Sequence, residues 1–490
     1  MAEKRNLKNV LKDFFSESHF KGFYFFVFGA FVLLFFIILV KSGGASLKGA
    51  LFSDTSDTFM DHYNSMVYNE IDDPYTNRVI YPPLASFLYR LCNIAVPGDD
   101  YYSLVTDPYV LAQSRFLRVN QSFVFQFIIY AVIAMLIFLA ALCLLKKGSS
   151  WEKALFVGAT MVSLPFLYMA DRGNNILLPV AFSIFFVVLY DHKNKILREL
   201  GLISLAVAVG LKIYPLAFLV FFVADKKYKE LGRELIYIFG TLILPFFIFY
   251  DGIASMKLML GNLFGFSSKR TTETNLSGQL DFKRIFYFLH GCFRQYTGIT
   301  IAEGKREIYA NIFRYGLSAV CGLGALFTKK MWKRTALIAA VIFGFPGSAS
   351  TYSLLFMVIP LALFLDEEKK PGLENYIYLS FFVLINIPLL MKQGTAYTRY
   401  WPTKLESFAV AGIVFFAFVD MISDFAAWDV DRKRENRPFL KAAGSDLLYR
   451  FIINRKTPAA AGAGGPAPAA PLPVSETGSL PEEGGAANEK

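Results

Sequence analysis

Residues 22–40 read GFYFFVFGAFVLLFFIILV, a run without a charged side chain. A helix needs about 20 such residues to cross the hydrocarbon of a bilayer. A cleaved signal peptide has a shorter apolar region and a cleavage site of small residues, so we expect a retained first membrane helix. Basic residues before the run predict a cytoplasmic N-terminus: Lys4, Arg5, Lys8 and Lys12.

The composition of the whole chain agrees with this interpretation. Of the 490 residues, 55% are hydrophobic and 18% are charged, and phenylalanine occurs 51 times. Soluble proteins carry charge on about a quarter of their residues, and four cysteines are too few for a disulfide framework. The composition excludes an ordinary soluble enzyme, a disordered protein and a fibrous one. It predicts an all-α polytopic membrane protein.

Further apolar segments predict a bundle of about twelve membrane helices. The pair within 199–224 is interrupted at Lys212 and Pro215, and one kinked helix is the alternative there. After the first run, the segments lie at roughly 122–145, 153–170, 175–190, 199–213, 214–224, 232–250, 306–327, 335–347, 351–365, 374–391 and 405–423.

Basic residues cluster in the connections that this scheme places on one side of the membrane, as the positive-inside rule requires. The net charge of +11 is therefore mainly a topology signal. The clusters are short and dispersed, so we predict no nucleic-acid binding. They comprise Lys146, Lys147 and Lys153; Lys193, Lys195 and Arg198; Lys226, Lys227, Lys229 and Arg233; Lys329, Lys330, Lys333 and Arg334; and Arg432, Lys433, Arg434 and Arg437.

The scheme divides the chain into four parts, with both termini in the cytoplasm. They are a cytoplasmic N-terminus at 1–20, a membrane domain at 21–424, a basic cytoplasmic segment at 425–457 and a tail at 458–490. The tail is rich in Ala, Gly and Pro, so we expect it to be disordered. Two long outer loops are predicted at about 42–121 and 251–305. The first contains YPPLASFLYRLCNIAV, which predicts a helix at the membrane surface that begins at its prolines.

The first outer loop also carries an acidic cluster in FSDTSDTFMDHYNSMVYNEIDDPY, residues 52–75. Such a cluster can act as a general base, hold a cation or form a solvated surface. Asp57 and Asp61 are four residues apart and share one face of a helix. Together with Asp54 they could supply oxygen ligands to a metal, but nothing in the sequence fixes their spacing. We therefore predict no metal site.

Two further segments offer cations near the membrane. Arg172 lies in DRGNN at 171–175, which is either a polar turn or a phosphate contact. Lys212 interrupts the apolar stretch GLKIYPLAF at 210–218, with Pro215 three residues later. Ionisable residues within membrane segments are functional candidates, although a lysine at a helix end can instead extend to the interface. We favour an anion contact for Lys212.

Two later segments are weaker signals. TNLSGQLDFKRIF at 274–286 suggests a loop that touches a partner, and GFPGSASTYSLLFMVIPL at 344–361 suggests a packing corner or a polar turn. The chain has no GxxxxGK[ST] phosphate loop and no HExxH, and its four histidines are scattered. ATP-driven transport and zinc catalysis are therefore not expected.

These segments, in this order, resemble the GT-C membrane glycosyltransferases, and glycosyltransferase family 87 most of all. That family has an outer-loop Asp, a PY pair and a YPP motif, then GN, K-x-x-P and N-x-S elements and a late S-x-x-x-Y element. The matching residues here are Asp57 or Asp61, Pro74 with Tyr75, Tyr81-Pro82-Pro83, Gly173-Asn174, Lys212 with Tyr214 and Pro215, Asn275 with Ser277, and Ser348 with Tyr352. The resemblance spans roughly residues 20–365.

The resemblance implies a GT-C-like bundle in the cell membrane, bacterial plasma membrane being favoured. It implies transfer of one sugar, mannose favoured, from a polyprenyl-phosphate donor to a lipid-linked or cell-envelope glycan on the outer face. It implies contact with membrane lipids and no cofactor. Asp57 or Asp61 would be the general base of an inverting displacement. The phosphate would meet Lys212, Arg172, Arg78, Arg115 and Arg118. Substrate-binding candidates are Asp54, Tyr75, Tyr81, Asn174, Tyr214, Asn275, Ser277 and Tyr352.

A secondary transporter of a small solute is the main alternative, because about twelve spans and a lysine at mid-membrane fit that class. Against it, the acidic residues gather in a loop, whereas transporters place ionisable groups within their spans. A non-enzymatic assembly or flippase subunit is a third possibility.

Overall fold

The computed structural model describes residues 19–52, 58–69, 73–76, 79–96, 121–270, 282–346, 350–368, 372–388, 391–393, 396–398 and 400–434. These residues are helical apart from turns and one antiparallel hairpin of β1 (Met391–Gln393) and β2 (Ala396–Thr398). The predicted all-α class is confirmed. The segment 458–490, predicted to be a disordered tail, lies outside the described residues.

The first membrane run is helix α2 (His19–Lys41), and the expected surface helix is α5 (Pro83–Asn93), which begins at a proline as predicted. The α-helices between and after them are α3 (Ala45–Ala50), α4 (Met60–Tyr68), α8 (Gln121–Leu145), α9 (Ser150–Met161), α10 (Leu164–Arg172), α11 (Leu177–Leu189), α12 (Lys195–Leu211), α13 (Val220–Ala224), α14 (Tyr228–Ile243), α15 (Ser255–Arg270), α16 (Phe282–Thr297), α17 (Glu303–Phe327), α18 (Met331–Gly344), α19 (Val358–Glu367), α20 (Leu373–Asn386) and α21 (Tyr400–Arg434). Four short 3-10 helices complete the set: η2 (Tyr214–Leu219), η3 (Leu244–Ile248), η4 (Gly252–Ala254) and η5 (Thr351–Met357).

Within the described residues, five helical segments are long and apolar enough to cross a membrane. Helices α9 and α10 pass the same test together, bent by 54°, which makes up to six. The predicted count of about twelve is not confirmed, because several apolar segments fold as shorter helices or as 3-10 turns that begin beside a proline. The five segments are Lys21–Lys41, Gln121–Leu145, Tyr228–Ile248, Gly304–Phe327 and Leu405–Ser423.

Both predicted outer loops contain helices where the structure describes them. The first contains α3, α4 and α5, and the second contains α15 and α16. Helices α15 and α16 expose large apolar side chains, which suits helices that lie along a membrane surface. Those side chains include Leu258, Leu260, Phe264, Phe288 and Phe293.

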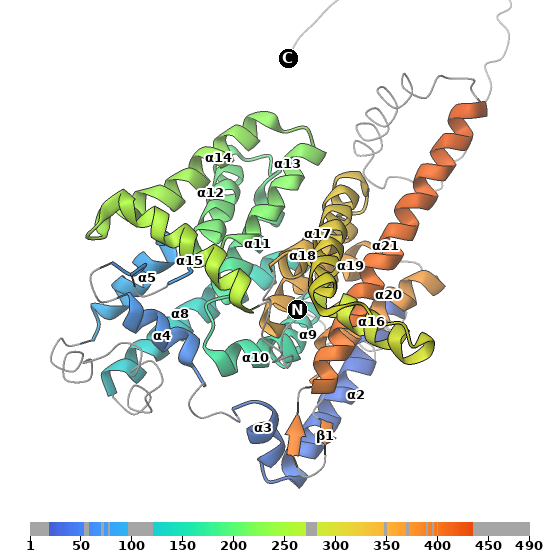
Figure 1. The fold of residues 1–490 in the computed structure, drawn as a ribbon, viewed down its shortest axis with the longest axis horizontal. Helices are drawn as coiled ribbons and strands as arrows, with labels where there is room; N and C mark the ends of the chain where they lie inside the picture. The colour runs from blue at the N-terminus through green and yellow to red at the C-terminus, as the bar shows by residue number, and fades with distance from the viewer. Residues whose placement is uncertain are drawn as a thin grey trace, which may run out of the picture. The chain divides into compact units, whose positions relative to one another are not determined.

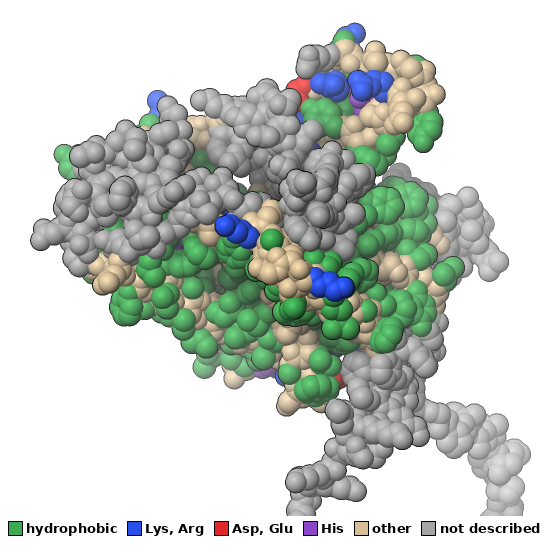
Figure 2. Space-filling model, turned by 90° about the horizontal axis from the view of Figure 1, so that it is seen from below, with side chains coloured by type: hydrophobic (Ala, Val, Ile, Leu, Met, Phe, Trp, Pro, Cys, Tyr) green, Lys and Arg blue, Asp and Glu red, His purple; other side chains and the backbone are tan. Residues whose placement is uncertain are grey.

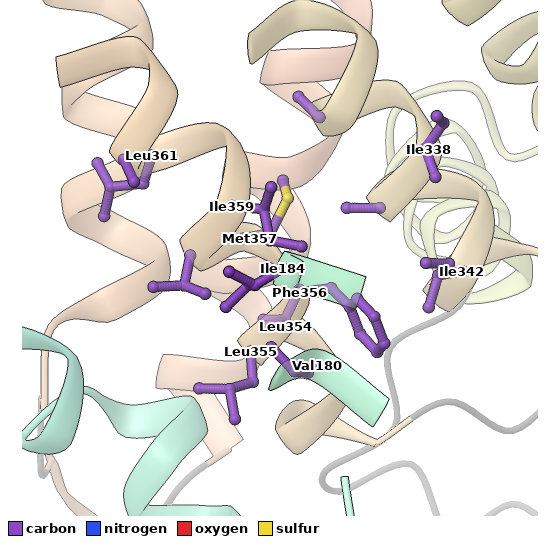
Figure 3. Close-up of a cluster of buried hydrophobic side chains, with 14 of the residues drawn as sticks. Val180, Ile184, Ile338, Ile342, Leu354, Leu355, Phe356, Met357, Ile359 and Leu361 are labelled. Carbon is purple, nitrogen blue, oxygen red and sulfur yellow. The ribbon is translucent and has the colours of Figure 1, made fainter. Parts of the chain in front are cut away.

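The core forms where short apolar helices pack on one another. Helix α11 packs against α8 and α12, helix α12 against α14, and helix α18 against α17 and α19, as Figure 1 shows. Figure 3 shows part of this core, where buried hydrophobic side chains of α11, α18, η5 and α19 meet. The labelled residues there are Val180, Ile184, Ile338, Ile342, Leu354, Leu355, Phe356, Met357, Ile359 and Leu361. This packing brings η5, late in the chain, against the middle of the sequence.

The described surface is rich in hydrophobic side chains. In Figure 2, which views the protein from below, they cover most of the described face, and Lys and Arg appear in a few places. Large side chains on α2 and α8 are among the most exposed, including Phe26, Val40, Phe125 and Leu136. An apolar exterior of this extent is suited to contact with lipid.

Ion pairs join the basic connections at the end of the bundle where α2 begins and α12 starts. Lys21 of α2 pairs with Glu152 at 3.0 Å, and Arg334 pairs with Asp225 at 2.9 Å. Similar pairs at this end are Lys146 with Asp366, Lys227 with Asp191 and Lys330 with Glu368. Members of three predicted basic clusters therefore form ion pairs at this end, as their assignment to one side requires. We call this the basic end.

Candidate functional site

The site forms at the opposite end, where α4 meets the turn after α10. The backbone N–H of Phe59 donates to the Asp171 carbonyl at 2.8 Å, and the Asp171 carboxylate accepts from the Phe52 N–H at 2.9 Å. Gly173 ends α10 with φ 61°, and a Cβ there would lie 3.0 Å from the Phe59 Cα. Glycine is required by both the backbone angle and the contact, so the DRGNN turn is shaped to receive α4.

The carboxylate of Asp61 is held by two side chains of this turn. Arg172 Nη2 donates to Asp61 Oδ1 at 2.6 Å, and Asn174 Nδ2 donates to Asp61 Oδ2 at 2.7 Å. Asp61 lies in the first turn of α4, while Arg172 ends α10. The structure thus brings together three predicted site residues, although the bonded pairs are 111 and 113 positions apart in the sequence.

Lys212 extends this network on the other side of Asn174. Its Nζ donates to Asn174 Oδ1 at 2.7 Å, so one amide joins the carboxylate to the ammonium. Lys212 is 5% exposed and follows directly after the end of α12. The sequence supports this position because Pro215 prevents the helix from continuing.

Three predicted tyrosines surround the Lys212 ammonium. Its Nζ lies 5.5 Å from the ring centroid of Tyr81, 5.8 Å from Tyr214 and 5.2 Å from Tyr352. Aromatic faces attract a cation within about 6 Å without neutralising its charge. Among the described residues, no carboxylate forms an ion pair with Lys212. The ammonium is therefore oriented but retains capacity to bind an anion.

Tyr75, another predicted substrate contact, lies behind this group. It is buried, its hydroxyl donates to the Tyr81 carbonyl at 3.2 Å, and its ring packs on Phe246 and Phe249. Asn262 Nδ2 donates to the Tyr75 carbonyl at 2.7 Å. Tyr75 therefore supports the YPP segment from behind and places Tyr81 beside Lys212.

His62 fixes the other face of α4. Its Nε2 lies 2.9 Å from Gln126 Oε1 on α8, and its ring lies 4.6 Å from the ring of Tyr130. Burial lowers the pKa of His62 to about 4, although the bond to Gln126 acts in the opposite direction. A neutral imidazole thus holds α4 against α8, while its neighbour Asp61 faces the turn after α10.

An apolar cavity of about 500 Å³ lies between α5, α8, α11 and α12. Leu211 on its wall directly precedes Lys212, and Gln126 and Tyr130 on its wall contact His62. Side chains of Leu84, Ile133 and Phe182 give the cavity its apolar lining. The polar cluster and an apolar space therefore adjoin each other across α4 and the end of α12.

Several predicted site residues lie outside the described residues, so their roles stay predictions. They are the base candidate Asp57, the substrate candidates Asp54, Asn275 and Ser277, and the phosphate candidates Arg78, Arg115 and Arg118. Among the residues that are described, no group of three or more His, Cys, Asp or Glu side chains could hold a metal ion.

Two members of the DRGNN turn were missed at the sequence level. Asp171 joins the turn to the segment before α4, as described above. Asn175 is 1% exposed, and neither atom of its amide has a hydrogen-bond partner among the described residues. Consecutive asparagines after a glycine suggested a turn. The pattern alone did not show that the amide of Asn175 would be buried without hydrogen-bond partners.

A family match covers the middle of the chain. Residues 109–302 match glycosyltransferase family 87. The matched part contains the DRGNN turn, Lys212 and Tyr214. The family 87 resemblance predicted from the motifs is therefore confirmed over this part of the chain, whereas Asp61, Tyr81 and Tyr352 lie outside the matched residues. Neither the curated proteins nor the solved structures give a significant match to the chain.

Proposed function

We propose that this protein is a membrane glycosyltransferase of family 87 type. It would move one sugar, mannose favoured, from a polyprenyl-phosphate donor to a hydroxyl of a lipid-linked or cell-envelope glycan on the outer face of the cell membrane. The observation that carries the proposal is the environment of Lys212. The buried ammonium donates a hydrogen bond to Asn174 and is surrounded by tyrosine rings. The same Asn174 amide donates a hydrogen bond to the carboxylate of Asp61. Such a group can receive the phosphate of a lipid donor beside an acidic residue.

The proposed reaction is a single displacement with inversion at the anomeric carbon. The acceptor oxygen forms a bond to that carbon while the bond from the carbon to the phosphate oxygen breaks. The electron pair of the broken bond stays on the phosphate, and the hydroxyl proton passes to a carboxylate. Lys212 stabilises the charge that grows on the leaving phosphate. No nucleotide takes part because the phosphate departs with its lipid.

The contacts of Asp61 bear on the choice between the two candidate bases. Both of its carboxylate oxygens already accept bonds, from Arg172 and Asn174. These bonds, one of them from a guanidinium, stabilise the ionised carboxylate and so make proton uptake by Asp61 less favourable. We therefore propose that Asp61 positions the DRGNN turn and, through Asn174, Lys212. We favour Asp57 as the general base.

The apolar cavity supports a lipid donor. Its volume of about 500 Å³ suits several isoprene units, and Leu211 on its wall adjoins Lys212. A chain in the cavity would leave its phosphate near the ammonium. The Asn175 amide nitrogen and oxygen have no hydrogen-bond partner among the described residues, so this amide is suited to binding two neighbouring sugar hydroxyls. In this arrangement lipid, phosphate and sugar occupy adjacent places.

The direct test is transfer from radiolabelled polyprenyl-phosphate mannose, and from other polyprenyl-phosphate sugars, to extracted cell lipids. We expect Lys212→Ala to raise the KM for the donor about 10-fold or more, because a charged hydrogen bond contributes about 1.5–3 kcal/mol. Lys195→Ala is the matched control, since this exposed lysine begins the same helix. An unchanged donor KM in Lys212→Ala would contradict the phosphate assignment.

The variants Asp57→Asn and Asp61→Asn distinguish between the two candidates for the general base. We expect Asp57→Asn to abolish transfer at normal expression and melting temperature. Asp61→Asn should reduce transfer and also raise the donor KM, since Asn174 and Lys212 lose their support. Full activity in both variants would refute a carboxylate base at this site. Solute uptake into liposomes without any transfer would favour the transporter.

A further inference from the structure

Six lysine and arginine side chains among the described residues are buried, and four of them pair with carboxylates. The pairs are Lys146 with Asp366, Lys283 with Glu307, Lys333 with Glu374 and Asp420, and Arg334 with Asp225. The other two are Lys212 and Arg314, which form no ion pair with a described residue. Lys212 is accounted for by the proposed donor phosphate, whereas Arg314 is not.

The guanidinium of Arg314 is incompletely bonded. Its Nη2 donates to the Tyr315 hydroxyl, and its Cζ lies 4.4 Å from the centroid of the Tyr315 ring. Its Nε and Nη1 are buried without a hydrogen-bond partner among the described residues. Arg334, equally buried, bonds through all three nitrogens: to the Ala325 carbonyl at 3.1 Å, to Asp225 at 2.9 Å and to the Thr328 carbonyl at 3.3 Å.

This contrast points to a missing anion. A guanidinium keeps its charge in a protein, and an uncompensated buried charge costs several kcal/mol. Arg314 also lies within α17, one of the candidate membrane spans, where an ionisable residue is a functional candidate. A bound anion would supply the counter-charge that the described residues do not.

The position of Arg314 indicates what kind of molecule this is. Ile312 is 61% exposed and Tyr315 is 48% exposed, so the helix faces lipid on either side of the arginine. The Tyr315 ring packs on Phe345, with 5.7 Å between ring centroids. Phe345 follows the end of α18 from which the chain continues to Tyr352 of the site. Arg314 thus lies on a helix whose neighbouring side chains are exposed and apolar or aromatic.

We propose that Arg314 binds the phosphate of a lipid, at a site separate from Lys212. A planar guanidinium suits phosphate oxygens, and the exposed apolar side chains around it suit the hydrocarbon of the same molecule. Tyr315 covers the guanidinium and would move aside for the phosphate. The lipid is either the sugar acceptor or a phospholipid of the membrane. The site does not depend on the proposed transfer reaction.

The test measures the melting temperature of the purified full chain in a neutral detergent, with phosphatidic acid or with diacylglycerol of the same acyl chains. The background is Lys212→Gln, so that the donor site does not contribute. We expect phosphatidic acid, but not diacylglycerol, to raise the melting temperature, and Arg314→Gln to abolish this rise. Without lipid, Arg314→Gln should melt higher than its parent, because an uncompensated charge has been removed.

Arg334→Gln is the matched control, since it removes a fully paired arginine. It should melt lower than its parent and keep the rise with phosphatidic acid. A full rise in Arg314→Gln, or equal effects of the two lipids, would overturn the proposal. If Arg314→Gln does not fold, Arg314→Lys is used instead. A melting temperature that rises with phosphatidic acid but not with diacylglycerol in Arg314→Lys would support the proposal, and the absence of this difference would contradict it.

A kinetic measurement then separates the two lipid sources. If the acceptor supplies the phosphate, Arg314→Gln should raise the acceptor KM about 10-fold and leave the donor KM unchanged. If a membrane phospholipid supplies it, both KM values stay the same while the melting effect persists. Either result supports a second lipid-phosphate site. Since the melting experiment needs no transfer, failure of the proposed reaction would not be confused with failure of this site.

Discussion

At the scale of single residues, the DRGNN turn illustrates how four neighbouring residues take separate roles. Asp171 binds the backbone before α4, Gly173 permits the close approach, and Asn174 joins Asp61 to Lys212. Arg172 completes the hold on Asp61. The sequence singled out Arg172 and Asn174 and predicted a turn at Gly173, but it gave Asp171 no role. It could not predict that Arg172 would bond to Asp61, because that contact depends on how distant helices pack.

Asn174→Ala should reduce transfer strongly while the protein stays folded. The variant removes bonds to two charged groups, each contributing about 1.5–3 kcal/mol, so we expect a fall in kcat/KM of about 10-fold or more. Asn386→Ala is the control, because that buried amide bonds within its own helix to the Phe382 carbonyl at 2.8 Å. Comparable kinetics in both variants would show that the amide bridge is not needed.

Gly173→Ala should lower the stability of the protein. A side chain at φ 61° costs roughly 1–3 kcal/mol, and the added Cβ also approaches the Phe59 backbone. In Gly158→Ala, by contrast, the new Cβ meets nothing within 4 Å in α9, and alanine favours helix. Melting temperatures in detergent should fall for the first variant and hold or rise for the second. The reverse order would contradict this account of the turn.

At the scale of elements, the apolar pattern predicted where helices form, and Lys212 with Pro215 predicted one of the places where they break. The predicted apolar segments are helical, and α5 begins at Pro83 as expected. The segment 199–224 divides into α12, η2 and α13, because Lys212 leaves the helix and Pro215 starts a 3-10 turn. The bend between α9 and α10 also falls beside a proline, since Pro165 lies in the first turn of α10. A long apolar run specifies burial more firmly than it specifies a straight helix.

The contact between α4 and α8 should weaken in acid. His62 has a folded-state pKa of about 4, below the ordinary value of 6.5, because burial disfavours its charged form. The unfolded chain therefore binds the proton first, so stability is complete above pH 6.5 and declines as the pH falls towards 4. His62→Phe should therefore lose less of its free energy of unfolding in acid, and the difference from the wild type should be roughly 2 kcal/mol at pH 4.5.

The measurement is the melting temperature of the wild type and of His62→Phe in detergent between pH 7 and pH 4.5. His192→Phe serves as the control because His192 is exposed near the basic end. We expect the wild type and the control to lose stability in parallel. A His62→Phe curve parallel to both would show that this imidazole does not limit acid stability.

At the scale of the molecule, the two ends differ in chemistry. The basic end gathers lysines and arginines in ion pairs, and the other end holds the site with its buried Lys212. Helix α12, from Lys195 to Leu211, connects the two. Charge patterns in the sequence indicated this polarity, because each basic cluster falls between apolar segments. They could not give the number of membrane crossings, since short helices and bent pairs have the same composition as spans.

Membrane sidedness can be tested with single cysteines in a chain whose four native cysteines are replaced. Thr76→Cys reports on the site end and Lys193→Cys on the basic end, and both positions are exposed. In intact cells, a membrane-impermeant maleimide should label the first and not the second. After the membrane is opened, it should label both. Labelling of Lys193→Cys alone in intact cells would place the site in the cytoplasm and exclude an external donor.

The cage of three tyrosines around Lys212 has a consequence for turnover. Because no described carboxylate neutralises this ammonium, the spent carrier, which bears more negative charge than the intact donor, would bind there more tightly after transfer than before it. Departure of the used lipid, rather than formation of the glycosidic bond, would then set the pace of the cycle. A membrane rich in free polyprenyl phosphate would slow the protein by product inhibition, and its output would follow how quickly the carrier is recharged with sugar.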